Sequence, residues 1–464
     1  MDSRLDDARG AGRRRIPVAL DGLEQWLRIP SISGDPAHRG DVARAAEWIA
    51  ARLAKTTGAV RIVRSAHNPV VLARVSATRP AVARLLVYGH LDVKPPGPGW
   101  TSKPFEPVRR GGLLIARGAS DDKGQFMAHV AAVEAWASIG GPPLDVSFVV
   151  DGAEEIGSPG LKAVLDRHRG LLGADAATVL ISDTKMAGPG RPTLTVSQRG
   201  MLGVKVVVST GREGVHAGRY GGAVIDPTQV LAAAILRAAR VVRRLTGAGR
   251  PPGPTDADVR NGAAGRAVHR DRLAERSTTC GALTVTSFES GSTAGAIPTT
   301  AKATLDVRIP PQLNVADAYR AIAAALRGND HPRVDLQLNC MASASGVLLR
   351  QPPTVRQNVD RACRLAFGRP AASISSGGSI PAVDLLFRIF GRPPILLGFG
   401  PPDDGAHGPD ERIHLGDWAN CVETSICLMG FLSGSVTAAS TQHPDSSFSD
   451  TLFPHGSRGT AALL

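Results

Sequence analysis

The sequence predicts an α/β fold in which a central sheet flanked by helices is interrupted by a smaller inserted α+β unit. The chain has 464 residues, about three domain lengths, so two or three packing units are expected. Hydrophobic residues make up 43% and charged residues 20%, as in globular proteins. Short apolar runs alternate with helical stretches along most of the chain, a pattern typical of helices packed on a sheet.

Both ends of the chain contribute elements to the larger part of this fold. Apolar residues recur at helical spacing from about residue 18 to 53, interrupted by a Pro/Ser/Gly break, and residues 125–136 carry apolar side chains close to one helix face. Four short apolar runs are expected to be strands: 85–88, 146–150, 179–181 and 395–397. These elements predict a sheet with helices on both faces.

The middle of the chain has a different order of elements. A strand beginning at Val204 precedes a helix over 228–245, and strands at 282–288 and 301–308 follow a loop rich in Pro, Gly and Asp at 249–265. The expected boundaries are 1–202 and 311–432 for the two parts of the larger domain, 203–310 for the inserted unit and 433–464 for a disordered or loosely attached tail.

The net charge of +13 invites a nucleic-acid interpretation, but its distribution argues against one. Of the 54 Lys and Arg residues only 8 are Lys, and the Arg residues are scattered apart from runs at 13–15, 109–110 and 243–244. A phosphate-binding surface usually has a basic cluster or stripe with aromatic residues, which make up only 4% of this chain. We therefore expect no nucleic-acid partner.

Cysteine usage and the apolar runs bear on the compartment. Five cysteines without a C-x-x-C pair predict neither a disulfide framework nor a thiolate zinc site, and they fit a reducing compartment. The first fifteen residues lack an apolar signal core, and no run of eighteen apolar residues occurs. The sequence therefore predicts a cytoplasmic protein that does not span a membrane.

Histidines and carboxylates follow the predicted strands, where ligand sites form in open α/β sheets. Each motif alone has a plain explanation: an H-x-D in a surface turn, an Asp pair capping a helix, or a Glu pair in a solvated loop. Together they suit borderline divalent metals, Zn²⁺ first, with Mn²⁺ or Co²⁺ as alternatives. With one carboxylate shared, the set matches a two-metal hydrolase in which a spare glutamate is the general base. The candidates are His90, Asp92, Asp121, Glu154, Glu155, Asp183 and His407, whereas Asp122 is expected to cap the helix that follows it.

Seven short strings carry a resemblance to a known family and cover about residues 18 to 432 in family order. The sequence is similar to the dinuclear-zinc metallopeptidase family that includes carnosinase-like dipeptidases, glutamate carboxypeptidase, aminoacylase and succinyl-diaminopimelate desuccinylase, and is closest to the dipeptidase branch. The strings are IPSIS (29–33), YGHLDVKP (88–95), WTSKPFEP (100–107), RGASDDKG (117–124), EEIGS (154–158), GGSIP (377–381) and AHGPDE (406–411).

The resemblance implies a catalytic domain with a central mixed sheet, interrupted by an α+β lid and dimerisation domain, and two divalent metal ions per subunit. Asp121 would bridge both ions. His90 and Asp183 would complete one site, and Glu155 and His407 the other.

Two further acidic residues have implied roles beside these ligands. Asp92 would orient His90 through its far ring nitrogen. Glu154 would deprotonate a metal-activated water and later pass the proton to the leaving amine.

Four residues would act on the substrate side of the site. His216, in the string GVHAGRYGG, matches a lid histidine that stabilises the oxyanion, commonly across a dimer interface, so a homodimer is expected. Arg308 would pair with a substrate C-terminal carboxylate, and Ser379 and Gly378 would line the same pocket. Plain alternatives are a turn residue for His216 and a surface charge at a strand end for Arg308.

The implied function is hydrolysis of the amide bond of dipeptides or small N-acyl amino acids with a free C-terminal carboxylate. A deacylase or desuccinylase-type amidohydrolase is the alternative within this class, and a non-catalytic binding protein on the same fold is the alternative outside it. The strings around His216 and after His407 depart from the family pattern on the substrate side, which leaves the choice of substrate open.

Overall fold

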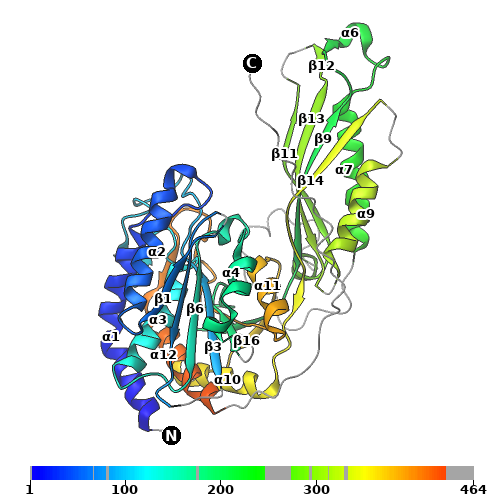
Figure 1. Cartoon of the computed structure of the whole chain (residues 1–464). Coiled ribbons are helices and arrows are strands. Elements are labelled where there is room, and N and C mark those ends of the chain that lie inside the picture. The colour runs from blue at the N-terminus through cyan, green and yellow to red at the C-terminus, as the bar shows by residue number, and fades with distance from the viewer. Residues whose placement is uncertain are drawn as a thin grey trace.

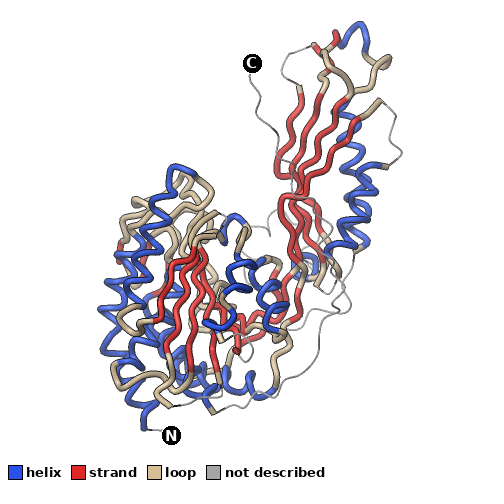
Figure 2. The backbone as a smooth tube through the Cα atoms, in the orientation of Figure 1, coloured by secondary structure: helices blue, strands red, loops and turns tan. Residues whose placement is uncertain are grey.

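The computed structural model describes residues 3–65, 67–79, 83–173, 177–245, 273–291, 295–311, 313–328 and 333–434 of the 464-residue chain. The chain forms two lobes: a broad one that contains a large sheet, and a narrow one that projects from it (Figure 1). Strands of both lobes meet near the junction in the tube view (Figure 2). Within the described residues, no helix is long and apolar enough to cross a membrane.

The broad lobe is built on a nine-stranded mixed sheet, which confirms the predicted α/β class. Its central strand β3 (Arg84–His90) runs parallel to both of its neighbours, β6 (Asp145–Asp151) and β7 (Ala177–Ile181), whereas β2 (Val70–Val75) pairs with β6 in the antiparallel direction. All four strands predicted for this lobe are present, as β3, β6, β7 and β17. Along the sheet the strands are β1 (Ala59–Val63), β2 (Val70–Val75), β6 (Asp145–Asp151), β3 (Arg84–His90), β7 (Ala177–Ile181), β17 (Ile395–Gly398), β8 (Thr193–Gln198) and β15 (Val347–Leu348), with β16 (Ala372–Ser376) also on β8.

Helices cover both faces of this sheet, and each face has its own hydrophobic core. In β3, Leu85 and Val87 face one core and Leu86 and Tyr88 face the other, so the strand reads as an unbroken apolar run. The first face carries α1 (Ser3–Leu27), α2 (Arg39–Leu53), α3 (Lys123–Ala137), α10 (Pro353–Phe367) and α12 (Leu415–Ser433). The second carries α4 (Leu161–Arg167), α5 (Arg169–Leu172) and α11 (Pro381–Phe390).

Short elements complete the broad lobe. A small sheet joins the segment before α3 to the segment before α12. Its strands are β18 (Arg412–His414), β5 (Leu113–Ile115) and β4 (Val108–Arg110), and two 3₁₀ turns lie at η1 (Pro36–His38) and η2 (Glu154–Ile156).

The narrow lobe, here called the lid, is a four-stranded antiparallel sheet with two helices packed on one face. The strand order is β11 (Ala282–Ser290), β13 (Thr300–Ile309), β9 (Gly200–Ser209) and β14 (Asp335–Ala344), and the helices are α7 (Pro227–Arg244) and α9 (Val315–Arg327). At the tip of the lid lie β10 (Val215–His216), α6 (Ala217–Tyr220) and β12 (Ala296–Ile297) (Figure 1). A short helix, α8 (Leu273–Thr278), precedes β11 in the chain.

The lid extends beyond the predicted end at residue 310. Strand β14 pairs with β9 along nearly its whole length, and α9 packs with α7 in the lid core, so the unit continues to Ala344. Residues of β14 alternate between exposed and half-buried up to Ser343, because one face of the strand is open to solvent. Its pairing with β9 is what assigns the strand to the lid. The predicted loop at 249–265 and the tail after Gly434 lie outside the described residues.

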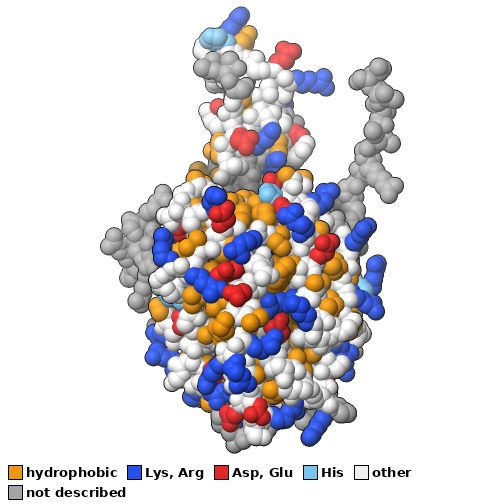
Figure 3. Space-filling view, turned by 90° about the vertical axis from the view of Figure 1, so that its left-hand side faces the viewer, with side chains coloured by type: hydrophobic (Ala, Val, Ile, Leu, Met, Phe, Trp, Pro, Cys, Tyr) orange, Lys and Arg blue, Asp and Glu red, His pale blue; other side chains and the backbone are white. Residues whose placement is uncertain are grey.

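Charged side chains of both signs are interspersed on the face of the broad lobe shown in Figure 3. Several arginines of the broad lobe pair with nearby acids: Arg9 lies 2.6 Å and Arg13 3.0 Å from the Glu423 carboxylate, and Arg109 lies 2.8 Å from Asp21. Part of the Arg excess is thus engaged in local ion pairs.

Folding stability should fall below neutral pH because of His129 in α3. This side chain is 1% exposed, its Nδ1 lies 2.9 Å from Ser425 Oγ, and no described residue forms a hydrogen bond with its Nε2. Burial lowers its pKa from 6.5 to about 3. Between pH 3 and pH 6.5 the unfolded chain binds a proton at His129 and the folded chain does not. The contribution of neutral His129 to folding stability is therefore fully present above about pH 6.5 and is lost as the pH falls toward 3.

Urea unfolding at pH 7.5 and pH 5 measures this effect in the wild type and in His129→Leu. The histidine should contribute a loss of about 2 kcal/mol between these pH values, and the leucine variant should lack that contribution. His67→Gln, at an exposed position, is the control and should keep the wild-type pH dependence. An equal pH dependence in His129→Leu and wild type would contradict the assignment.

Candidate metal centre

Five loops bring the candidate ligands to one edge of the large sheet. Strands β3, β6 and β7 are parallel neighbours, so the segments that follow them meet at the same edge. The ligand candidates lie at the end of β3 (His90), after β6 (Glu155), after β7 (Asp183), before α3 (Asp121) and between β17 and β18 (His407).

Asp121 lies at the centre and directs its two oxygens to different histidines. Its Oδ1 is 3.0 Å from His90 Nε2, and its Oδ2 is 2.9 Å from His407 Nε2. Asp183 Oδ2 is 3.8 Å from His90 Nε2, and Glu155 Oε2 is 3.3 Å from His407 Nε2. Two groups of three residues that could each hold a metal ion therefore share one carboxylate: His90, Asp121 and Asp183, and Asp121, Glu155 and His407.

Proton equilibria in this cluster show how strongly its charges interact. Although burial alone would raise it, the hydrogen bonds from His407 and His90 hold the pKa of Asp121 well below its usual range. The hydrogen bonds to Asp121 and Glu155 raise the pKa of His407 to about 10. Burial raises the pKa of Asp183 well above its usual value, and the charge of Asp121 adds to this.

These residues fit a pair of divalent cations. The donors are imidazole nitrogens and carboxylate oxygens with no thiolate, which suits zinc, manganese or cobalt. The Nε2 atoms of His90 and His407 lie at hydrogen-bond distance from the shared carboxylate, and bound cations would take the place of the protons that such hydrogen bonds need.

Glu154 lies beside the ligands without belonging to either group. Burial raises its pKa to about 8, and the charges of Glu155, Asp121 and Asp92 act in the same direction. A carboxylate with a pKa near neutrality can take up and release a proton, as a general base requires.

Asp92 has a second function in the structure that the sequence does not reveal. His90 Nδ1 lies 3.0 Å from the Asp92 main-chain oxygen and 3.4 Å from its carboxylate, as expected for a residue that orients the ring. The same carboxylate accepts hydrogen bonds from the backbone N–H groups of Glu154 and Glu155, at 3.2 and 3.0 Å. One buried aspartate thus fixes a ligand histidine and the turn that carries the two glutamates.

Two residues next to the cluster have contacts that the sequence did not predict. The capping interpretation of Asp122 is wrong: its side chain makes no cap hydrogen bond to α3, and its Oδ2 accepts from the backbone N–H of His90 at 3.2 Å. Lys94 was missed, although it stands inside a matched string, and its Nζ lies 3.1 Å from Glu155 Oε2.

Arg308 and Ser379 meet where the lid joins the broad lobe. Arg308 Nη1 donates to Ser379 Oγ at 3.1 Å, while its Nε and Nη2 donate to the two oxygens of Asp306 at 2.9 and 3.0 Å. Asp306 thus holds one edge of the guanidinium and leaves N–H groups on the other edge. The neighbouring Gly378 is exposed, and its N–H donates to Ser376 Oγ at 3.1 Å.

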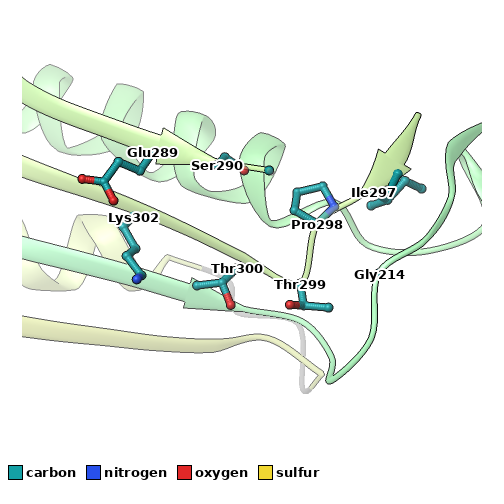
Figure 4. A pocket seen from close by; sticks show the side chains of 10 residues that line it. Gly214, Glu289, Ser290, Ile297, Pro298, Thr299, Thr300 and Lys302 are labelled. Carbon is teal, nitrogen blue, oxygen red and sulfur yellow. The ribbon is translucent and has the colours of Figure 1, made fainter. Parts of the chain in front are cut away.

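His216 is not brought to the cluster within one chain. It lies at the tip of the lid, beside α6, where it is exposed and its Nδ1 accepts from the Gly218 N–H at 3.1 Å (Figure 1). A cavity of about 600 Å³ lies at the same tip, and Glu289 and Lys302 project beside it (Figure 4). This cavity is separate from the metal cluster, since none of the cluster residues lines it.

Comparison with known proteins gives one consistent result. The model of peptidase family M20/M25/M40 matches residues 86–429. The probable di- and tripeptidase DUG2 of Saccharomyces cerevisiae is 25% identical over 384 residues, which is 77% of this chain but only 43% of the length of that protein. The human Beta-Ala-His dipeptidase is 23% identical over 84% of this chain and 85% of its own length.

The solved structures include similar folds. The dipeptidase Dug1p of Saccharomyces cerevisiae superposes with a TM-score of 0.77 at 21% identity, covering 94% of this chain and 100% of that chain. At this identity the likeness establishes the two-lobed fold.

Proposed function

The chain belongs to peptidase family M20/M25/M40, and from this premise we propose that it hydrolyses the amide bond of dipeptides or small N-acyl amino acids that end in a free carboxylate. One observation carries the proposal. The shared carboxylate of Asp121 joins two ligand groups directly beside Glu154, whose pKa is about 8. The dipeptidases among the relatives support a dipeptide as the substrate.

We infer that His90, Asp121 and Asp183 hold one zinc ion and that Asp121, Glu155 and His407 hold the other. When bound, such ions polarise the scissile carbonyl and lower the pKa of the attacking water. Glu154 accepts the proton of that water and delivers it to the leaving amine, while Asp92 holds the turn that carries Glu154. Manganese and cobalt use the same ligand types and are the alternatives.

Arg308 is proposed to bind the terminal carboxylate of the substrate. Asp306 accepts hydrogen bonds from Nε and Nη2 of Arg308 and so fixes the orientation of the guanidinium. The N–H groups that do not bind Asp306 therefore point in a fixed direction. A fixed planar fork suits a planar carboxylate. Ser379 accepts a hydrogen bond from the same guanidinium, which supports the proposal that Ser379 and the neighbouring Gly378 line the pocket for the substrate carboxylate.

We also propose that the protein works as a cytoplasmic homodimer in which His216 acts in the site of the partner subunit. In support, the five cysteines are free thiols, and His216 is exposed at the lid tip. An active preparation that sediments as a monomer would contradict the dimer.

The proposed activity is tested by a hydrolysis screen of the zinc-reconstituted protein. Dipeptides should be cleaved, their C-terminal amides should be poor substrates, and Arg308→Gln should raise KM for the free acids about 10- to 100-fold while changing the amides little. Asp335→Asn, on the exposed edge of the lid, is the control variant and should behave as wild type.

The same screen separates the alternatives. Faster cleavage of N-acyl amino acids than of dipeptides would favour the deacylase. No hydrolysis of any substrate by protein with two bound ions would favour a non-catalytic binding protein and reject the proposal.

A further inference from the structure

Glu411 is a fully buried carboxylate outside both ligand groups, and it holds the loop that carries Asp121. It is 0% exposed and stands just before β18, four residues after His407. Its Oε1 accepts from the backbone N–H groups of Ser120 and Asp121, each at 2.9 Å. Its Oε2 accepts from the Gly118 N–H at 3.0 Å and from Arg117 Nη1 at 2.6 Å. All four donors belong to the segment that ends at Asp121.

Arg117 extends this contact back to the loop of His407. It is 1% exposed, and its Nη2 donates to the main-chain oxygen of Gly408 at 3.1 Å, while its guanidinium lies over the Trp100 ring at 5.3 Å. The Glu411–Arg117 pair therefore joins the segment of one predicted ligand to the residue next to another.

The loop of His407 needs such support because its backbone is strained. His407 and Asp410 have φ angles of 61° and 53°, in the left-handed region that is unfavourable for residues with a side chain. The side chain of His407 is 55% exposed, so packing alone does little to fix it.

A second buried acid reinforces the connection. Asp404 Oδ2 accepts from Ser120 Oγ at 2.8 Å, and its Oδ1 lies 3.1 Å from Lys185 Nζ. Lys185 follows Asp183 by two residues. Both acids thus connect the Asp121 segment to the loop that carries His407.

We propose that Glu411 is a positioning residue that sets the separation of Asp121 and His407 and thereby the affinity of the ion held by Asp121, Glu155 and His407. The inference rests on the proposed function only in taking these three residues as metal ligands. Removal of groups that orient metal ligands typically costs 10- to 100-fold in metal affinity.

The test is Glu411→Gln. Glutamine has one oxygen and one NH₂ group, so in either orientation two of the four donors lose their acceptor. We expect the ion at Asp121, Glu155 and His407 to bind about 10- to 100-fold more weakly, with a smaller change at His90, Asp121 and Asp183. Titration of the metal-free protein with Zn²⁺ against a competing chelator gives both affinities without an activity assay.

Glu134→Gln is the matched control, because Glu134 is also a buried carboxylate in a bidentate arginine pair. It is 6% exposed, and Arg52 donates to its two oxygens at 2.8 and 3.0 Å, away from the ligand loops. This variant should lose stability in urea unfolding yet keep both Zn²⁺ affinities. Equal losses of affinity in the two variants would mean that Glu411 acts only through general stability.

Wild-type affinity for both ions in Glu411→Gln would overturn the proposal. If that variant does not fold, Arg117→Lys decides, since lysine keeps the charge but cannot donate to Glu411 and Gly408 through one planar fork. Unchanged affinity for the second ion in Arg117→Lys would then be the contrary result. Wild-type protein that binds two ions but hydrolyses no substrate would reject the proposed function and leave this inference standing.

Discussion

Replacement of Glu154 by glutamine is expected to lower kcat about 10²- to 10⁴-fold while both metal ions remain bound. Glu154 belongs to neither ligand group, so the donors for the two ions are intact in the variant. Glutamine has nearly the same shape but cannot take up a proton. Burial raises the pKa of Glu154 to about 8 in the metal-free protein, so the site favours uptake of a proton by the wild-type side chain.

Steady-state kinetics and elemental analysis of the same preparations measure the two halves of this result. Glu106→Gln, at a surface glutamate paired with Lys103, controls for the loss of a carboxylate and should retain wild-type kcat. Full turnover in Glu154→Gln would show that another group moves the proton.

Replacement of Asp121 by asparagine should reduce the bound metal from two ions to at most one per chain and abolish turnover. Both oxygens of the Asp121 carboxylate are needed, one toward His90 and one toward His407, and asparagine offers a single oxygen without charge. Metal content after dialysis against buffered zinc is the measurement.

The adjacent residue provides a matched control. Asp122 belongs to neither ligand group, and asparagine keeps an oxygen that can accept from the backbone N–H of His90, so Asp122→Asn removes a neighbouring carboxylate without removing a ligand. That variant should retain two ions per chain. Two ions in Asp121→Asn would contradict the bridging assignment.

Much of the broad lobe could be predicted because its signals are local. β3, β6, β7 and β17 are buried on both faces, so each appears as a short apolar run, and the residues after them gather at one edge because three of these strands are parallel neighbours. The five ligand candidates could be found from these positions together with the matched strings.

The remaining features depend on partners distant in sequence. The place of β14 in the lid follows from its register with β9, 126 to 143 residues earlier, and the alternating pattern of the strand does not reveal which strand it pairs with. Likewise, Glu411 acts through donors almost 300 residues away, and composition or spacing could not assign it to them. The two hydrogen bonds from Glu154 and Glu155 to Asp92 could be recognised only in three dimensions.

The lid sheet has a mechanical consequence. Arg308 lies near the end of β13 where the lid joins the broad lobe, and His216 lies at the opposite tip. The ten residues of β13 span about 30 Å, and the two strands paired with it, β11 and β9, stiffen them. In the proposed dimer this sheet would connect the two sites rigidly. Arg308 would lie in the site of its own subunit, and His216 would lie in the site of the partner subunit. Closure over one substrate would then move a group in the second site, and the two subunits would not open and close independently.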